Sequence, residues 1–343
     1  MSVLLNTLYV MTHGTRLRLD HETVCMEAEN GNKQLIPLHH LSGIVCIGNI
    51  IVSPPLMMKC ADEGRSITFL ETNGAFKARV EGPVSGNVLL RQAQYQMLGQ
   101  KEKQVELVRA MIAGKIQNMR SLLMRAARET SHEDDETVLR KAANALAIAL
   151  KHLQMADDIN QIRGIEGESS KNYFQAFSAM IRVQRDSFQM NGRNRRPPLD
   201  PINAVLSFLY TLLMHDCKGA IESVGLDPQV GFLHTLRPGR QSLALDIMEE
   251  LRSIFADRLA LTLINRQQIG PNDFESRPGG AIYLNEKGKK EVVIAYQKRK
   301  QDELLHPVLN RKVAFGLIPF VQARLLARYM RGDADSYIPY LYK

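Results

Sequence analysis

The stretch "QVELVRAMIAGKIQNMRSLLMRAARET" (104–130) carries a regular pattern of apolar and charged residues. Apolar residues recur in it at intervals of three and four, as in Val105, Val108, Ile112 and Ile116, and this is the period of an amphipathic helix. The remaining positions carry much of the charge: Arg109, Lys115, Arg120, Arg125 and Arg128. We therefore predict a long helix here, and the chain on its N-terminal side follows a different pattern.

The first eighty residues consist of short apolar segments separated by turn signals such as His13-Gly14 and Asn30-Gly31. The segments that predict strands are "NTLYVM" (6–11), "TRLRLD" (15–20), "ETVCMEA" (22–28), "KQLIPL" (33–38), "SGIVCIG" (42–48) and "RSITFLE" (65–71). Between the last two, "PPLMMKCADEG" (54–64) is typical of a short helix, with prolines in its first turn and Gly64 at its end.

Beyond residue 88 the helical period continues in "SHEDDETVLRKAANALAIALKHL" (131–153) and "PINAVLSFLYTLLMHDCKGAIESVG" (201–225). A small hairpin is predicted within "GGAIYLNEKGKKEVVIAY" (279–296), followed by a return to helix. The fold class predicted is α+β. We expect residues 1–82 to form a β-rich domain, which is a candidate for dimerisation. We expect residues 83–87 to form a linker and residues 88–343 to form a larger all-α catalytic domain.

The composition is that of a globular protein with a basic balance. Of 343 residues, 45% are hydrophobic and 23% charged, and 44 Lys and Arg against 36 Asp and Glu give a net charge of +8. That excess favours a polyanion such as nucleic acid as partner. The four cysteines have no CxxC spacing, and the sequence has neither a secretory signal pattern nor an apolar run of 18 residues. We therefore expect a cytoplasmic location and no membrane association.

Two segments hold the residues with chemical potential. In "GFLHTLRPGRQSLALDIMEELR" (231–252), His234 precedes Asp246 and Glu249, which lie on one face of a predicted helix. In "QIRGIEGESSKNYF" (161–174), Glu166 stands between Gly164 and Gly167. A pair of glycines inside a helix is costly, which indicates close approach of another backbone or of a ligand.

From the residues alone, the alternatives remain open. Glu166 can be a surface residue at a helix kink, His234 a hydrogen-bonded loop histidine, and the acids an ordinary solvated helix edge. The HExxH and P-loop patterns are absent, which removes the common zinc and nucleotide sites.

Three blocks together carry a resemblance: "GIEGESSKNYF", "DPINAVLSFLYTLL" and "GFLHTLRPGRQSLALDIMEELR". In this order they resemble the CRISPR-associated integrases, the first-numbered family of Cas proteins, and "RPGGAIYLNEKGKK" is similar to that family as well. The resemblance implies a homodimer and a divalent metal held by Glu166, His234 and Glu249, with Asp246 as auxiliary ligand or supporting group. Carboxylates with one imidazole suit Mg²⁺ or Mn²⁺.

The implied reaction is phosphoryl transfer, in which a 3′-hydroxyl of a short foreign DNA attacks a phosphodiester at the edge of a CRISPR repeat. With water as the attacking group, the same site is an endonuclease. The alternatives are a structure-selective metal-dependent DNase without integration, and a non-enzymatic DNA-binding scaffold. The family also implies double-stranded and branched DNA as partners, and a small second-numbered Cas protein that bridges two dimers.

Several further residues are candidates for DNA contact. The basic segment "NGRNRRPP" (191–198) has the pattern of a mobile loop for phosphate contact, and "KGKKEVVIAYQKRK" (287–300) is a second basic cluster, although either can be only a solvated surface. The two tyrosines below can instead be core residues with a bonded hydroxyl. The candidates are Arg163, Tyr173, Arg193, Arg195, Arg196, Tyr210, Arg237 and Arg240.

Overall fold

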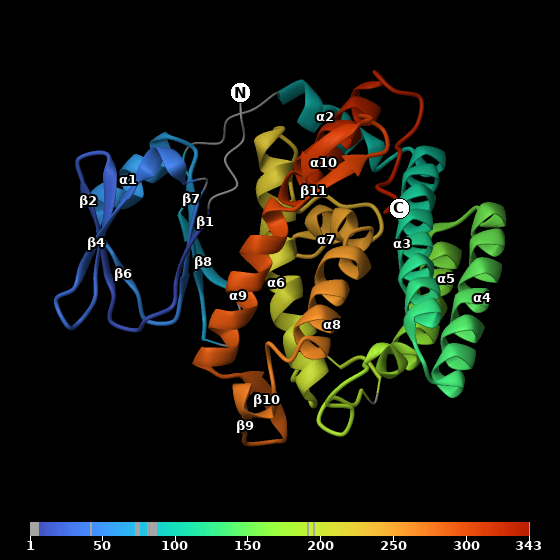
Figure 1. Cartoon of the computed structure of the whole chain (residues 1–343). Helices are drawn as coiled ribbons and strands as arrows, with labels where there is room; N and C mark the ends of the chain where they lie inside the picture. The colour runs from blue at the N-terminus through green and yellow to red at the C-terminus, as the bar shows by residue number, and fades with distance from the viewer. Residues whose placement is uncertain are drawn as a thin grey trace. The chain divides into compact units, whose positions relative to one another are not determined.

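The computed structural model describes residues 7–41, 43–72, 76–80, 82, 88–190, 192–194 and 196–342. The chain divides into two compact units, Met1–Ser85 and Gly86–Lys343 (Figure 1). The predicted linker 83–87 lies outside the described residues. Across the described ranges, no helix is both long and apolar enough to cross a membrane.

The N-terminal unit contains two four-stranded sheets. One has the order β1-β5-β7-β8, with β1 (Thr7–Val10), β5 (Gly43–Ile47) and β7 (Ser66–Leu70) parallel and β8 (Phe76–Val80) antiparallel to β7. The other has the order β4-β3-β2-β6, built from β4 (Lys33–Pro37), β3 (Thr23–Glu27), β2 (Arg16–Asp20) and β6 (Ile51–Val52). Helix α1 (Pro54–Asp62) follows β6. This β-rich unit agrees with the predicted fold class.

Turn and helix chemistry explains these elements. Gly64 ends α1 at a φ of +69°, a left-handed conformation that glycine adopts without a steric cost. The alternating strand residues Leu17, Val24 and Ile67 point into one buried core with Leu56 of α1. Strands β6 and β8 were not predicted, since β6 has two residues and β8 ("FKARV") mixes charged with apolar residues.

The C-terminal unit is mostly helical. Its helices are α2 (Val88–Met97), α3 (Lys101–Glu129), α4 (Glu133–Met155), α5 (Ile159–Gln175), α6 (Pro201–Ser223), α7 (Ser242–Glu249), α8 (Arg258–Asn265), α9 (Glu286–Gln301) and α10 (Ile318–Arg331). Helix α3 packs against α4 and α5, and α6 packs against α7 and α10. Because α6 is apolar on most of its surface, neighbouring elements cover it on several sides. Helix α3 contacts both α5 and α7, so these three helices lie around one site.

Two small hairpins accompany these helices. Strands β9 (Phe274–Arg277) and β10 (Ala281–Leu284) form one, and β11 (Glu303–His306) and β12 (Arg311–Ala314) form the other. The hairpin predicted within 279–296 was wrong in its second arm, which is the first part of α9. The side chain of Asn285 accepts a hydrogen bond from the Gly288 backbone N–H, and this cap starts a helix where a strand was expected.

Candidate functional site

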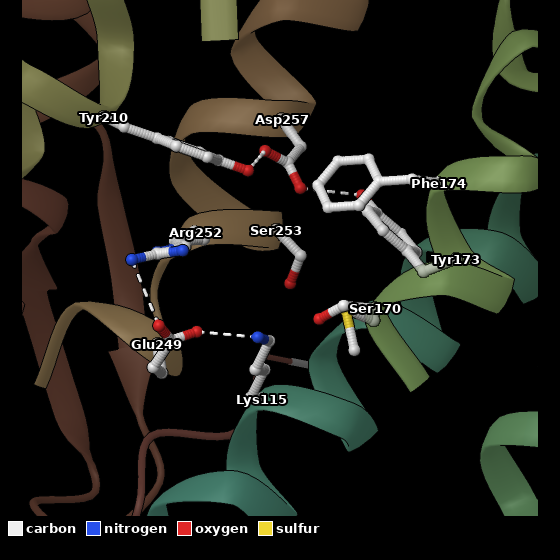
Figure 2. Close-up of a pocket in the computed structure, with 10 residues that line it drawn as sticks. Lys115, Ser170, Tyr173, Phe174, Tyr210, Glu249, Arg252, Ser253 and Asp257 are labelled. Carbon is white, nitrogen blue, oxygen red and sulfur yellow. Dashed lines mark hydrogen bonds and ion pairs between the residues drawn. The ribbon is translucent and has the colours of Figure 1, made fainter. Parts of the chain in front are cut away.

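Three helices bring a lysine and two glutamates together. Lys115 of α3 forms an ion pair with Glu166 of α5. Its Nζ lies 2.7 Å from Glu249 Oε2 at the end of α7, and Figure 2 shows this second pair. The side chains of Lys115 and Glu249 are only 6% and 3% exposed, whereas that of Glu166 is 26% exposed. A buried ammonium thus lies between two carboxylates, one of which is open to solvent.

Glu166 is oriented by its own helix. Ser170, one turn further along α5, donates a hydrogen bond of 2.8 Å to Glu166 Oε1. The expected close approach of another backbone to Gly164 or Gly167 is wrong, since a Cβ atom at either glycine would meet nothing of the described chain within 4 Å. Both glycines lie at the exposed side of α5, so the space beside Glu166 is open for a ligand.

His234 is held by Asp246. The two Asp246 oxygens accept hydrogen bonds from the backbone N–H groups of Phe232 (2.6 Å), Leu233 (3.0 Å) and His234 (3.0 Å), and Oδ1 lies 2.6 Å from His234 Nδ1. The Asp246 side chain has no exposed surface. Its oxygens are therefore used to fix the loop and the imidazole, which favours the supporting role over the auxiliary-ligand role. His234 Nε2 is left facing Glu249, 3.7 Å from Oε1.

Gly231 allows the loop to reach this carboxylate. A Cβ atom at position 231 would lie 2.6 Å from the backbone carbon of Ser242, 2.7 Å from Asp246 Oδ2 and 2.8 Å from the backbone nitrogen of Leu243. Two of these atoms belong to the backbone at the start of α7, so they cannot move away independently. Only glycine permits this approach of the loop to α7.

Replacing Gly231 by alanine is expected to displace the loop that carries His234. We expect a loss of about 2 kcal/mol in the free energy of unfolding, as in overpacked cores, together with weaker binding of a divalent ion. Urea denaturation and calorimetric titration with MnCl₂ measure the two effects. The matched control is Gly219→Ala in α6, where a Cβ meets nothing within 4 Å and the substitution is expected to stabilise the helix. Equal effects in the two variants would contradict this role of Gly231.

A π-helical turn (Arg252–Asp257) after α7 adds an arginine to the site. Arg252 Nη2 lies 3.0 Å from Glu249 Oε1. Burial of Glu249 opposes its negative charge, but Arg252, Lys115 and His234 together outweigh burial and lower its pKa to about 2. Glu249 is therefore an anion at any working pH. π-helical turns are frequent at functional sites because they change which side chains share a face.

The same turn places Asp257 against two tyrosines. Tyr173 of α5 donates to Asp257 Oδ2 at 2.8 Å, and Tyr210 of α6 donates to Oδ1 at 2.6 Å. Burial raises the Asp257 pKa to about 6, although the two phenol hydrogen bonds oppose the shift. These residues and the Lys115–Glu249 pair line one small cavity, and Figure 2 shows the two groups at its opposite ends.

As the side chains lie, no group of three His, Cys, Asp or Glu residues in the described part of the chain is placed to hold a metal ion. The physical reason is Lys115, whose ammonium fills the space between Glu166 and Glu249. The predicted ligands Glu166, His234 and Glu249 nevertheless share one site, with the imidazole beside one of the two carboxylates. Their chemical types, two carboxylates and an imidazole, are ligands for Mg²⁺ or Mn²⁺.

The predicted arginines divide into internal and exposed groups. Arg163 donates from Nε (2.8 Å) and Nη2 (2.6 Å) to the Leu233 carbonyl, so it supports the His234 loop. Arg193 donates to Asn203 Oδ1 at 2.6 Å and lies over the Tyr210 ring, which ties it to the fold. Among the others, Arg196 and Arg237 are exposed, Arg240 is half-buried, and Arg195 lies outside the described residues.

Tyr173 and Tyr210 are both buried, and their hydroxyls are bonded to Asp257. Of the alternatives left open by the sequence, this placement favours core residues with a bonded hydroxyl over direct contact with DNA. The basic cluster in 287–300 is helical, and part of it is internal, since Lys300 lies 2.9 Å from Asp216.

Sequence reasoning missed three residues of the site: Lys115, Arg252 and Asp257. The signal for Lys115 was present, because it follows Ile112 by three positions and precedes Ile116, on the apolar face of α3. A charged residue on that face indicates a buried partner, since a buried charge is costly unless it is paired. Arg252 and Asp257 gave no comparable signal, because the π-helical turn does not follow the α-helical period.

Comparison with known proteins gives a consistent result. The family model described as CRISPR associated protein Cas1 matches residues 8–298. The "CRISPR-associated endonuclease Cas1 1" of Moorella thermoacetica is 56% identical over 343 residues, which is the whole of both chains.

Two solved structures share the fold. A casposase bound to integration product superposes with a TM-score of 0.83 at 22% identity, covering 97% of this chain and 92% of its own. A Cas6-RT-Cas1–Cas2 complex gives a TM-score of 0.83 at 20% identity, covering 99% of this chain and 36% of that chain. At these identities the likeness supports the architecture alone.

Proposed function

Because this chain belongs to the CRISPR-associated Cas1 family, whose curated members are named endonucleases, we propose that it joins 3′-hydroxyl ends of short foreign DNA to a CRISPR repeat by phosphoryl transfer. The observation that carries the proposal is the buried ammonium between Glu166 and Glu249. A site that holds one cation between two carboxylates has the charge and the ligand types for a divalent ion. The casposase bound to integration product, which has the same fold, supports the joining reaction.

In this proposal Glu166, His234 and Glu249 hold Mg²⁺ or Mn²⁺. The chemistry that such an ion supplies is neutralisation of the charge that develops on the phosphodiester. Asp246 keeps the His234 ring in place and assigns its Nδ1 as the donor, so Nε2 is available as a ligand. Glu249 is already ionised before an ion binds, because Lys115 and Arg252 stabilise its carboxylate.

The remaining residues of the site bind and position DNA. Residues 235–239, directly after His234, are exposed, and Arg237 in this loop is placed to contact the phosphate backbone. The open side of α5 at Gly164 and Gly167 leaves room for a DNA strand beside Glu166. With a 3′-hydroxyl as the attacking group the product is joined DNA, and with water it is cut DNA.

We also propose the assembly. A DNA fragment has two ends, so two sites must act at a fixed distance. The resemblance to the family implies that a homodimer, and a small second-numbered Cas partner that bridges two dimers, set this distance. The solved Cas6-RT-Cas1–Cas2 complex, whose fold this chain shares, supports the partner. The N-terminal β-rich unit remains the candidate for the dimer surface.

Strand joining tests the proposed function. Purified full-length protein is mixed with its small Cas partner, a short duplex with 3′-hydroxyl ends and a supercoiled plasmid that carries the matching repeat, in Mn²⁺, in Mg²⁺ and in chelator. We expect joining at the repeat edge that requires the metal. Cutting of branched DNA without any joining favours the structure-selective nuclease, and binding of DNA without either reaction favours the scaffold.

Replacing Lys115 by methionine is expected to strengthen the binding of a divalent ion. The substitution keeps the apolar stem but removes the ammonium that competes for Glu166 and Glu249. We expect the Kd for Mn²⁺ to fall by about tenfold, which corresponds to about 1.4 kcal/mol, and the metal-free protein to become less stable because two carboxylates lose their counter-ion.

Calorimetric titration with MnCl₂ and thermal unfolding in chelator check this prediction without any turnover. Lys218→Met is the matched control, since Lys218 is also buried and is paired with Glu222 on α6, away from the site. An unchanged or weaker affinity for Mn²⁺ in Lys115→Met would contradict competition between the lysine and the metal.

A further inference from the structure

A small cavity connects the proposed metal site with a buried carboxylate. Lys115 and Glu249 line one end of it, and Asp257 with its two tyrosines lines the other (Figure 2). Ser170, which also lines the cavity, donates to Glu166, so one hydrogen bond links the cavity wall to the second proposed carboxylate ligand. Its volume is about 20 Å³, which is room for one water molecule.

The cavity wall includes a hydroxyl with no internal partner. Ser253 is 1% exposed, and its Oγ forms no hydrogen bond with any residue that the structure describes. In Figure 2 the Ser253 hydroxyl points into the space between Asp257 and Lys115. Because buried hydroxyls are normally bonded, this atom calls for a water molecule or a ligand in the cavity.

The charged and titratable groups around Asp257 come from every element packed against it. They are Tyr173 on α5, Tyr210 on α6, Arg193 before α6, Arg252 in the π-helical turn itself, and Lys115 on α3, which lines the same cavity. Burial and Asp257 raise the pKa of both tyrosines well above their usual value, so the phenols stay protonated and act only as donors. Asp257 is therefore the group of this cluster that changes its protonation near neutral pH.

We propose that Asp257 accepts the proton released by the attacking hydroxyl through a water molecule in the cavity, which the Ser253 hydroxyl holds in place. The inference rests on the proposed function, for which it names a proton acceptor. Glu249 is a weak proton acceptor because Lys115 and Arg252 stabilise its ionised form, whereas the hydrogen-bond donors to Asp257 are two neutral phenols.

The step balances as follows. The O–H bond of the attacking hydroxyl breaks while its oxygen bonds to phosphorus, and the bond from phosphorus to the leaving oxygen breaks. The proton passes to the water that the Ser253 hydroxyl holds, and the water gives a proton to Asp257. The leaving oxygen takes a proton from solvent, and Asp257 returns its proton to solvent after the products depart.

The protonation of Asp257 determines how the rate of the reaction depends on pH. Asp257 must be ionised to accept a proton, so the rate rises with pH through a pKa of about 6. The Tyr173 phenol lowers the Asp257 pKa by its hydrogen bond, and removing that hydroxyl raises the pKa. Tyr173→Phe is therefore expected to move the acidic limb of the profile to higher pH, while its ring keeps its contacts with Phe174 and Phe177.

The test measures single-turnover cutting of a branched DNA duplex in Mn²⁺ from pH 5 to pH 8 with the full-length chain. We expect Asp257→Asn to lower the rate by at least about a hundredfold and to remove the limb near pH 6. Ser253→Ala is expected to slow cutting by about tenfold. Its matched control is Ser169→Ala, a buried serine whose hydroxyl also lacks a partner among the described residues but does not line the cavity, and its rate is expected to equal wild type.

The outcomes separate this inference from the proposed function. If wild type cuts DNA but the acidic limb is unchanged in both Tyr173→Phe and Asp257→Asn, the proton route is wrong and the proposed function stands. Equal rates for Ser253→Ala and Ser169→Ala would exclude Ser253 from the route. A wild-type chain that neither cuts nor joins DNA in Mn²⁺ would overturn both.

Discussion

Replacing Glu166 by alanine is expected to reduce metal-dependent joining and cutting of DNA by at least a thousandfold, which corresponds to about 4 kcal/mol of barrier. Of the two carboxylates paired with Lys115, that of Glu166 is the more exposed, so we expect Glu166 to lie nearer the DNA. Its loss removes one of three proposed ligands. The fold is expected to persist, because Lys115 keeps its ion pair with Glu249.

The control for this prediction is Glu168→Ala on the same helix, since Glu168 is exposed and bonded only to the half-buried Asn172 among the contacts seen for it. Both variants are compared in strand joining, in Mn²⁺ titration and in thermal unfolding. We expect Glu168→Ala to match wild type in all three. Joining that survives Glu166→Ala would mean that the proposed metal site is assigned to the wrong residues.

Replacing Asp246 by alanine is expected to be the most destabilising single change in the site. The side chain accepts three backbone hydrogen bonds and binds the His234 ring, all in a fully buried position. A buried donor left without a partner costs about 1–3 kcal/mol, so the loss in the free energy of unfolding is expected to reach about 4 kcal/mol. Binding of Mn²⁺ is expected to weaken as well, because His234 loses its orientation.

Urea denaturation measures the loss in the free energy of unfolding, and Asp158→Ala is the reference variant for its size. Asp158 caps α5 and accepts one exposed backbone hydrogen bond from Asn160, so its loss is expected to cost about 1 kcal/mol. If Asp246→Ala destabilises the protein no more than Asp158→Ala, the loop at 231–234 is held by other contacts.

The fold class followed from local patterns in the sequence. The turn signals and short apolar segments before residue 82 predicted six of the strands, and the helical period predicted α3, α4 and α6. These patterns are local, so they can be recognised without knowing which helices and strands pack against one another. Errors arose where the local pattern was short or mixed, as in β6 and β8, or where a cap decided between helix and strand, as at Asn285.

The site was predictable only in part, because it is assembled from α3, α5, α7 and the loop at His234, which are distant in sequence. The resemblance to a known family supplied Glu166, His234 and Glu249, and the structure brings these three near one another. The sequence pattern predicted Lys115 as one of the charged surface residues of an amphipathic helix, whereas its ammonium is buried between two carboxylates in the structure. Asp246 can bind the loop that carries His234 only because Gly231 lets this loop approach α7 closely. Such an approach cannot be predicted from the spacing of residues in the sequence.

We propose that Glu166, His234 and Glu249 hold the divalent ion that acts on DNA. The most direct measurement is an anomalous difference map from crystals of the full-length protein grown with MnCl₂. The account predicts one Mn²⁺ peak bound by carboxylate oxygens of Glu166 and Glu249 and by His234 Nε2, with Lys115 moved away from its place between the carboxylates. A peak bound elsewhere, or a Lys115 ammonium that still lies between the carboxylates at saturating Mn²⁺, would contradict it.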